Sequence, residues 1–278
     1  MAKPYTLAIS SHKGGFGRTL SAAALAVSLG RNGMTVAILD VTRTKDLQEI
    51  AARVEWENVV LMGDEGLGMT PDYVIVDCPH LSEPDAVSVL SYADGALITC
   101  PPERSATVTI STAVKALLRA QSENPGLEIL GICLTSFREE SSRQQGVLEE
   151  LSELHPGLML EAVVPADTAF SKWALRPSRP PVDGAAFQAY AKLAEHIETR
   201  RQHLLSNPAP SGLEELVAAI AREDAADASE RQLVDDINWC ELCGGSIPRK
   251  FVRNGKARRN AKGQLSCAKC LGQPVGVN

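Results

Sequence analysis

The sequence lacks any apolar run long enough to cross a membrane. Its longest such stretch, Leu20 to Leu29, is alanine-rich and only ten residues long, whereas a membrane-spanning helix needs about 20 apolar residues. No signal-peptide pattern precedes the first motif, and there is no internal repeat. The chain has 278 residues, 44% of them hydrophobic, which is ample for a buried core. We therefore expect a globular, cytoplasmic protein without a membrane partner.

Acidic residues are almost missing from the last part of the chain. Residues 239–278 contain eight Lys or Arg and one acid, Glu241, and carry a net charge of +7, whereas residues 1–238 carry −13. An acidic body followed by a basic tail predicts an anionic partner for the tail. Docking of the tail on its own acidic body is the alternative.

Short apolar runs alternate with helix-like segments from Tyr5 to about Arg200. The runs YTLAIS, MTVAILD, DYVIVD, GALITC and LEILGICL indicate buried strands, with NVVLM and LMLEAVV as weaker candidates. The segments TLSAAALAVSLGRNG and SATVTISTAVKALLRA have lengths that suit crossover helices. This alternation predicts an α/β fold with a doubly wound, mostly parallel sheet that is covered on both faces.

The pattern divides the chain into three parts. Residues 1–205 form the α/β domain, which the helical sequence FQAYAKLAEHIETRRQHLL closes, residues 206–238 form a linker with an amphipathic and acidic helix, and residues 239–278 form a small basic module. Ser211 and Glu214 have the spacing of a capping box at the start of the linker helix. Its apolar face is expected to dock on the main domain or to pair with a second copy.

A glycine-rich turn separates the first strand from the first helix. The sequence SHKGGFGRTL places Gly14, Gly15 and Gly17 where backbone N–H groups can approach phosphate oxygens at a helix N-terminus. The hydroxyl of Thr19 is placed to bind Mg²⁺. The G-x-G-x-x-G pattern of dinucleotide-binding folds is absent. The turn therefore predicts a phosphate-binding loop.

In this context the loop resembles the K-G-G-x-G-K-[ST] loop of the deviant Walker A ATPases, the ParA/MinD family. The sequence PDYVIVDCPH is similar to the Walker B strand of that family, and VAILDVT is similar to its strand that ends in D-x-D. The resemblance covers about the first 200 residues. Only 36 residues separate Asp40 from Asp77, which suits the compact, plasmid-partition-like members.

The resemblance implies a homodimer that binds ATP or ADP with Mg²⁺. Lys13 would reach across the dimer to the partner's phosphates and is the one catalytic candidate, while Thr19 and Asp77 would hold the magnesium, with Asp40 linked to it through water. In the family, ATP drives dimerisation and non-specific DNA binding, and a partner protein stimulates hydrolysis. The positions expected to contact the nucleotide are Lys13, Gly14, Gly15, Phe16, Gly17, Arg18, Thr19, Leu20, Asp40 and Asp77.

Two positions depart from the family's pattern. Arg18 replaces the loop lysine that contacts the β- and γ-phosphates, and a planar guanidinium is not equivalent to a compact ammonium. Thr42 stands where the second aspartate of D-x-D would position the attacking water, and threonine is not an ionisable base. Because phosphoryl transfer depends on positioning and charge, we predict ATP binding with weakened or lost hydrolysis. The alternative is that Arg18 substitutes adequately and Asp46 supplies the carboxylate.

Two functions are consistent with these features. The first is a ParA-like, nucleotide-dependent dimeric switch in DNA partition or cargo positioning, located at the nucleoid if it binds DNA. The second is an adaptor or regulator that binds nucleotide structurally without hydrolysing it. A MinD-like membrane role is disfavoured, because the chain ends in a cysteine-containing module instead of a basic amphipathic helix.

Four of the seven cysteines have metal-binding spacing. Cys240 and Cys243 form one C-x-x-C pair, Cys267 and Cys270 form another, and 23 residues separate the pairs. Two such pairs predict a Cys₄ zinc site, like that of a zinc ribbon, whose metal stabilises the small module. Redox-active pairs or disulfides are the alternative.

The loop between the two cysteine pairs holds most of the basic residues of this module. Phe251 lies among them, and Trp239 precedes the first pair. This combination favours contact with a nucleic-acid backbone, and an acidic protein is the alternative partner. The other cysteines, Cys78, Cys100 and Cys133, lie in or just after apolar runs, where we expect them to act as small hydrophobic residues.

Overall fold

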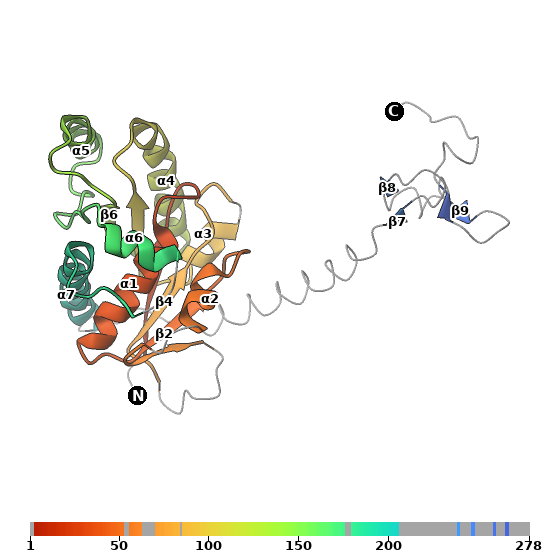
Figure 1. The fold of residues 1–278 in the computed structure, drawn as a ribbon, viewed down its shortest axis with the longest axis horizontal. Helices are drawn as coiled ribbons and strands as arrows, with labels where there is room; N and C mark the ends of the chain where they lie inside the picture. The colour runs from red at the N-terminus through yellow and green to blue at the C-terminus, as the bar shows by residue number, and fades with distance from the viewer. Residues whose placement is uncertain are drawn as a thin grey trace. The chain divides into compact units, whose positions relative to one another are not determined.

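The computed structural model of the chain is shown in Figure 1. Two compact units are distinguished, Met1–Val217 and Ala218–Asn278. The structure describes residues 3–52, 56–62, 70–83, 85–175 and 179–205, and four two-residue strands: β7 (Asn238–Trp239), β8 (Ser246–Ile247), β9 (Arg258–Arg259) and β10 (Leu265–Ser266). β7 pairs with β8 and β9 with β10, both antiparallel.

A six-stranded sheet forms the centre of the first unit. Its strands are β1 (Tyr5–Ser10), β2 (Val36–Asp40), β3 (Val59–Leu61), β4 (Tyr73–Asp77), β5 (Gly95–Cys100) and β6 (Glu128–Leu134). They lie in the order β3-β2-β4-β1-β5-β6, and every pairing is parallel. The prediction of an α/β fold with a parallel sheet is confirmed.

One of the weaker strand candidates is wrong. The segment LMLEAVV is not a strand: it meets β6 in one isolated bridge, Ile132 with Met159, and in a hydrogen bond from Val164 N to the carbonyl of Leu134. The pairing is interrupted between these two contacts, and a second bridge, Phe137 with Pro165, lies beyond both β6 and this segment. The other weaker candidate, NVVLM, forms β3.

Helices cover both faces of the sheet. They are α1 (Arg18–Arg31), α2 (Asp46–Ala52), α3 (Asp85–Leu90), α4 (Arg104–Glu123), α5 (Ser142–Leu154), α6 (Thr168–Leu175) and α7 (Ala185–Leu205). The crossover through α1 runs from β1 towards one edge, and the crossovers through α3 and α4 run towards the other. Because such crossovers are right-handed, they place α1 and the pair α3 and α4 on opposite faces. In Figure 1, α7 lies beside α1, against which it packs.

Small residues on α1 and an aromatic cluster on α6 and α7 build the core of one face. The alanines of α1 are fully buried, so the helix lies close to the strands. Phe170 packs against Trp173, Phe187 and Tyr190 at ring-centroid distances of 5.4–5.9 Å. The hydroxyl of Tyr190 bonds that of Ser21 on α1 at 2.5 Å. These contacts fix α1, and with it the loop that precedes α1.

The three single cysteines are free thiols in this core. Cys78, Cys100 and Cys133 are buried, as expected for small hydrophobic residues, and burial raises the pKa of each thiol. Among the helices that the structure describes, none combines the length and apolarity needed to span a membrane.

Candidate functional site

The candidate site lies where three neighbouring strands end. β1 ends at Ser10, β2 at Asp40 and β4 at Asp77, and the two aspartates are direct register partners. In such sheets ligands bind beyond the carboxyl ends of the strands, at the point where the strand order reverses. Here β2, β3 and β4 lie on one side of β1, and β5 and β6 lie on the other. The loop that follows β1 therefore occupies this point.

Two glycines give this loop its shape. Gly15 and Gly17 have φ angles of 79° and 78°, in the left-handed region that other residues rarely adopt. A Cβ atom on Gly17 would lie 3.3 Å from Oγ1 of Thr135, just beyond β6. The same hydroxyl donates to the carbonyl of Phe16 at 3.3 Å. The loop thus closes against the end of β6. It leads directly into α1, whose N-cap residue is Gly17.

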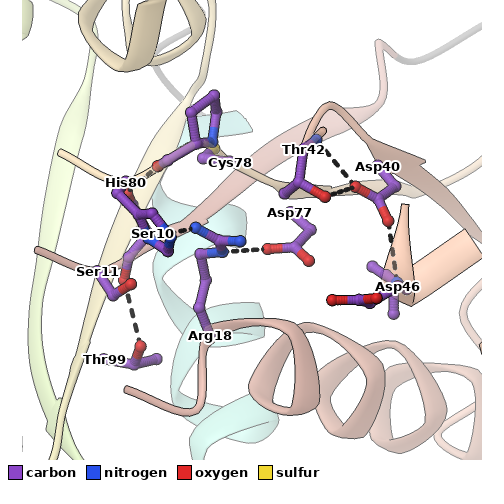
Figure 2. Close-up of polar contacts among 12 residues, drawn as sticks. Ser10, Ser11, Arg18, Asp40, Thr42, Asp46, Asp77, Cys78, His80 and Thr99 are labelled. Carbon is purple, nitrogen blue, oxygen red and sulfur yellow. Dashed lines mark hydrogen bonds and ion pairs between the residues drawn. The ribbon is translucent and has the colours of Figure 1, made fainter. Parts of the chain in front are cut away.

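Arg18 faces inward from the first turn of α1 and pairs with Asp77. Its Nε lies 2.5 Å from Asp77 Oδ1, and its Nη1 lies 2.8 Å from His80 Nδ1. The side chain of Arg18 is 10% exposed and that of Asp77 is not exposed at all. Figure 2 shows the guanidinium between the carboxylate and the imidazole. The arginine that replaces the loop lysine is therefore held in a buried ion pair.

Asp77 has one oxygen with a partner and one without. Burial raises its pKa to about 6, although the Arg18 charge and the Thr19 hydroxyl lower it. Its Oδ2 is buried and accepts no hydrogen bond from the residues that the structure describes. Mg²⁺ prefers oxygen ligands and keeps several of its waters. The orphaned Oδ2 and the hydroxyl of Thr19, which lies close enough to the carboxyl to lower the pKa of Asp77, are oxygen ligands that suit a hydrated magnesium ion.

In contrast, both carboxylate oxygens of Asp40 accept hydrogen bonds from nearby residues of the chain. Its Oδ1 accepts from N and Oγ1 of Thr42 at 2.9 and 2.6 Å, and its Oδ2 accepts from the N–H groups of Leu47 and Gln48 at 2.9 and 3.2 Å. Each oxygen thus accepts two hydrogen bonds, which fills its lone pairs. This geometry argues against the predicted role of Asp40 in holding magnesium through water.

Neither Thr42 nor Asp46 supplies a free carboxylate at the site. The buried Thr42 hydroxyl donates to Asp40, as Figure 2 shows. Asp46 is exposed at the start of α2, where its Oδ2 accepts from the Thr44 hydroxyl at 2.9 Å. The geometry therefore does not support the alternative in which Asp46 replaces the missing aspartate.

The remaining predicted nucleotide contacts differ in exposure. Lys13 and Gly14 are exposed, and Lys13 Nζ lies 5.3 Å from the ring centroid of Phe16, which is itself buried. Leu20 is partly buried and packs against the core. The exposed lysine thus lies over the ring of the buried phenylalanine.

Sequence reasoning missed His80. This residue follows Asp77 by three positions, and no motif rule assigns it a role. Its position beside Arg18 arises because Ser10 Oγ donates to the carbonyl of Pro79 at 3.1 Å and Leu81 N donates to the carbonyl of Ser11 at 2.8 Å. These two bonds hold the segment after β4 against the start of the glycine-rich loop.

An open cavity of about 450 Å³ lies beyond the end of β6. Phe137, Arg138, Asp167, Thr168 and Ser171 are among the residues that line it. Phe137 is two residues from Thr135, against which the glycine-rich loop closes.

Comparison with known proteins agrees with this geometry. The family model described as the CobQ/CobB/MinD/ParA nucleotide binding domain matches residues 7–180. The chain belongs to this family. The match includes the glycine-rich loop, Asp40 and Asp77, and the predicted family resemblance is confirmed for the α/β part of the chain.

Curated and solved members of the family show how far the similarity extends. The chromosome partitioning protein ParA of Caulobacter vibrioides is 27% identical over 141 residues, which cover 47% of this chain and 50% of that protein. The match thus spans about half the length of this relative. Cobyrinic acid a,c-diamide synthase from Mycobacterium smegmatis with bound ADP and magnesium aligns with a TM-score of 0.56 at 18% identity, over 72% of this chain and 96% of that one. A variant of McdA from Cyanothece in complex with ATP aligns with a TM-score of 0.59 at 15% identity, with the same coverage. At these identities the likeness shows the fold.

The predicted zinc ligands lie outside the described residues. These are Cys240, Cys243, Cys267 and Cys270. In the part of the chain that the structure does describe, no group of three or more His, Cys, Asp or Glu side chains is arranged to hold a metal ion.

Proposed function

We propose that this protein is a ParA-like nucleotide-binding switch that binds ATP or ADP and hydrolyses ATP slowly or not at all. The observation that carries this proposal is the buried pairing of Arg18 with Asp77 beneath an intact glycine-rich loop. The loop offers backbone N–H groups and the N-terminus of α1 to phosphate, which favour a bound anion. The open cavity beyond β6 offers space for the nucleoside.

Slow turnover follows from how the polar groups of the site are used. Arg18 is paired with Asp77, so its charge is partly neutralised before any phosphate binds. The Thr42 hydroxyl donates a hydrogen bond to Asp40, and threonine cannot act as a base towards a water molecule. Asp40 itself has no free lone pair. Because catalysis of phosphoryl transfer depends on charge and positioning, these arrangements favour retention of the nucleotide over its hydrolysis.

The magnesium role belongs to Thr19 and Asp77. When bound, Mg²⁺ neutralises charge on the phosphates. Thr19 and Asp77 Oδ2 would hold it, and Asp77 Oδ1 keeps Arg18 in place at the same time. Asp77 would thus bind the metal with one oxygen and position Arg18 with the other.

Nucleotide-dependent homodimer formation is part of the proposal. Lys13 is exposed, which suits a residue that contacts the phosphates of a second copy. A relative is a chromosome partitioning protein, which supports a role in DNA partition or cargo positioning, in the cytoplasm or at the nucleoid. Retention of the nucleotide, which the Arg18–Asp77 pair favours, is also consistent with the second candidate, an adaptor or regulator in which the nucleotide stays bound.

The C-terminal module would give the switch its partner contact. We propose that Cys240, Cys243, Cys267 and Cys270 bind one zinc ion and that the basic residues between the pairs contact nucleic acid, with an acidic protein as the alternative. Metal analysis of the purified protein is expected to give one zinc per chain. Replacement of Cys240 and Cys243 by Ser is expected to abolish zinc binding, and unchanged zinc content would contradict this assignment.

ATP binding and turnover, measured with and without DNA, test the main proposal. We expect the wild-type protein to bind ATP in the presence of Mg²⁺ with little turnover, because neither Arg18 nor Thr42 is free to act on the γ-phosphate or water. The double variant Arg18→Lys and Thr42→Asp is expected to gain turnover, while each single variant is the matched control. Rapid hydrolysis by the wild type would contradict slow turnover, and absence of ATP binding would contradict the function as a whole.

A further inference from the structure

His80 occupies a fixed place beside the glycine-rich loop. Besides the bonds from Ser10 and Leu81 described above, the Ser82 hydroxyl donates to the carbonyl of His12 at 3.1 Å. The segment after β4 is therefore tied to three consecutive residues at the start of the loop, Ser10, Ser11 and His12. These bonds fix the backbone on either side of His80, and the contact with Arg18 Nη1 holds its ring.

Arg18 determines which ring nitrogen of His80 carries the proton. A guanidinium can only donate hydrogen bonds and stays charged at any pH at which the protein is folded. Because Arg18 Nη1 lies 2.8 Å from Nδ1, this nitrogen must accept and is unprotonated. The proton of the neutral ring is then on Nε2. Arg18 is held in place for this by its 2.5 Å bond to Asp77.

The other nitrogen, Nε2, is directed at the phosphate loop. A Cβ atom built on Gly14 would lie 3.6 Å from Nε2 and 3.8 Å from Cε1 of the His80 ring. The structure shows no hydrogen bond from Nε2 to any residue that it describes. The unpaired Nε2–H donor of His80 thus lies beside Gly14, a residue of the predicted phosphate-binding loop.

We propose that His80 is a phosphate-binding residue, an inference that rests on the proposed function. Its Nε2–H donates to a phosphate oxygen of the bound nucleotide. Arg18 is the positioning residue that fixes this tautomer. Arg18 then acts through His80 while it stays paired with Asp77. A neutral donor beside the loop then makes a phosphate contact that a loop cation would otherwise make. Hydrogen bonds to a charged phosphate are strong enough for this to affect affinity measurably.

Three substitutions of His80 distinguish the roles of its two ring nitrogens. The amide nitrogen of Gln can occupy the place of Nε2, that of Asn can occupy the place of Nδ1, and Phe keeps the ring without either. We expect His80→Phe and His80→Asn to weaken ATP binding by about tenfold or more, measured by calorimetry, and His80→Gln to stay within about threefold of wild type. His196→Phe, at an exposed position on α7, is the control and is expected to bind ATP normally.

The tautomer is measured directly by long-range ¹H–¹⁵N NMR of the histidine rings in the full chain. We expect the Nε2–H form for His80 in the wild type and a mixture of tautomers in Arg18→Met, which has no donor for Nδ1. A Nδ1–H form in the wild type, or ATP binding by His80→Phe equal to that of wild type, would overturn this proposal and leave nucleotide binding standing. Failure of the wild type to bind ATP would instead overturn the proposed function together with the role of His80.

Discussion

The two aspartates that end neighbouring strands, Asp40 and Asp77, have carboxylates in opposite hydrogen-bonding situations. Asp40 and Asp77 are register partners on β2 and β4, and both are buried. Asp40 accepts four hydrogen bonds from the segment that follows its own strand. Asp77 accepts from Arg18 on one oxygen, and the other oxygen is without a partner in the described chain.

This difference separates a structural carboxylate from one that is available to a ligand. Local donors satisfy Asp40 and fix the turn that leads into α2, whereas the groups around Asp77 come from α1 and leave one of its oxygens free. A buried acceptor without a partner is costly, so a bound ion or water at Asp77 Oδ2 would be stabilising. The comparison predicts that the two positions respond differently to substitution.

Removal of the Asp77 carboxylate is expected to have the largest effect. In Asp77→Ala the buried Arg18 loses its anion, which should lower the free energy of unfolding by about 3 kcal/mol or more. Urea denaturation at pH 7.5 measures this loss, and ATP binding in the presence of Mg²⁺ should be lost with it. In a double-mutant cycle, Arg18→Ala should cost much less in the Asp77→Ala background than in the wild type. Additive losses would show that the two side chains are not coupled.

Removal of the Asp40 carboxylate is expected to have a smaller effect, and on a different property. Asp40→Ala leaves the N–H groups of Leu47 and Gln48 without their acceptor, which should cost about 2 kcal/mol of stability. ATP affinity should change little, since Asp40 has no free lone pair for a metal-bound water. Thr42→Val, which removes only the hydroxyl bond to Asp40, should cost about 1 kcal/mol. Loss of Mg²⁺-dependent ATP binding in Asp40→Ala would remove the distinction between the two aspartates.

The smallest expected effect is a dependence of stability on pH. Burial raises the pKa of Asp77 from 3.8 to about 6, so the folded chain holds this proton more tightly than the unfolded chain does. The resulting stabilisation is present at low pH and is lost as pH rises through about 6. Between pH 7.5 and 5, the wild type should gain about 1 kcal/mol relative to Asp77→Asn in the absence of metal. A gap that stays constant, or that changes in the other direction, would show that the pKa is not raised.

The fold and the phosphate loop could be predicted because their signals are local. Buried parallel strands appear as apolar runs, and the glycines, Thr19 and the following helix stand next to one another in the chain. The strand prediction for LMLEAVV was wrong because an apolar run does not show whether a neighbouring strand edge can pair with it. The segment meets β6 in one isolated bridge and a few backbone hydrogen bonds, without a continuous ladder.

The chemistry of individual site residues was harder to predict. The sequence shows that Arg18 replaces a lysine, but its partners Asp77 and His80 lie 59 and 62 positions away. It also shows that Asp40 is retained where Thr42 departs from the family's pattern, but not that both oxygens of Asp40 are occupied. No motif pointed to His80, because its position depends on bonds between the segment after β4 and the loop after β1.

The amino-acid sequence by itself determined the family, the parallel α/β architecture and the place of the phosphate loop, since each of these follows from short patterns of apolar residues and glycines. The tertiary structure alone decided which carboxylate is free, where the Arg18 charge is directed and which nitrogen of His80 faces the loop. The physical reason is that the role of a buried polar group depends on the donors and charges within about 3 Å of it. In this protein, the groups that decide the roles of Asp77 and His80 are brought together from separate strands and helices by the sheet.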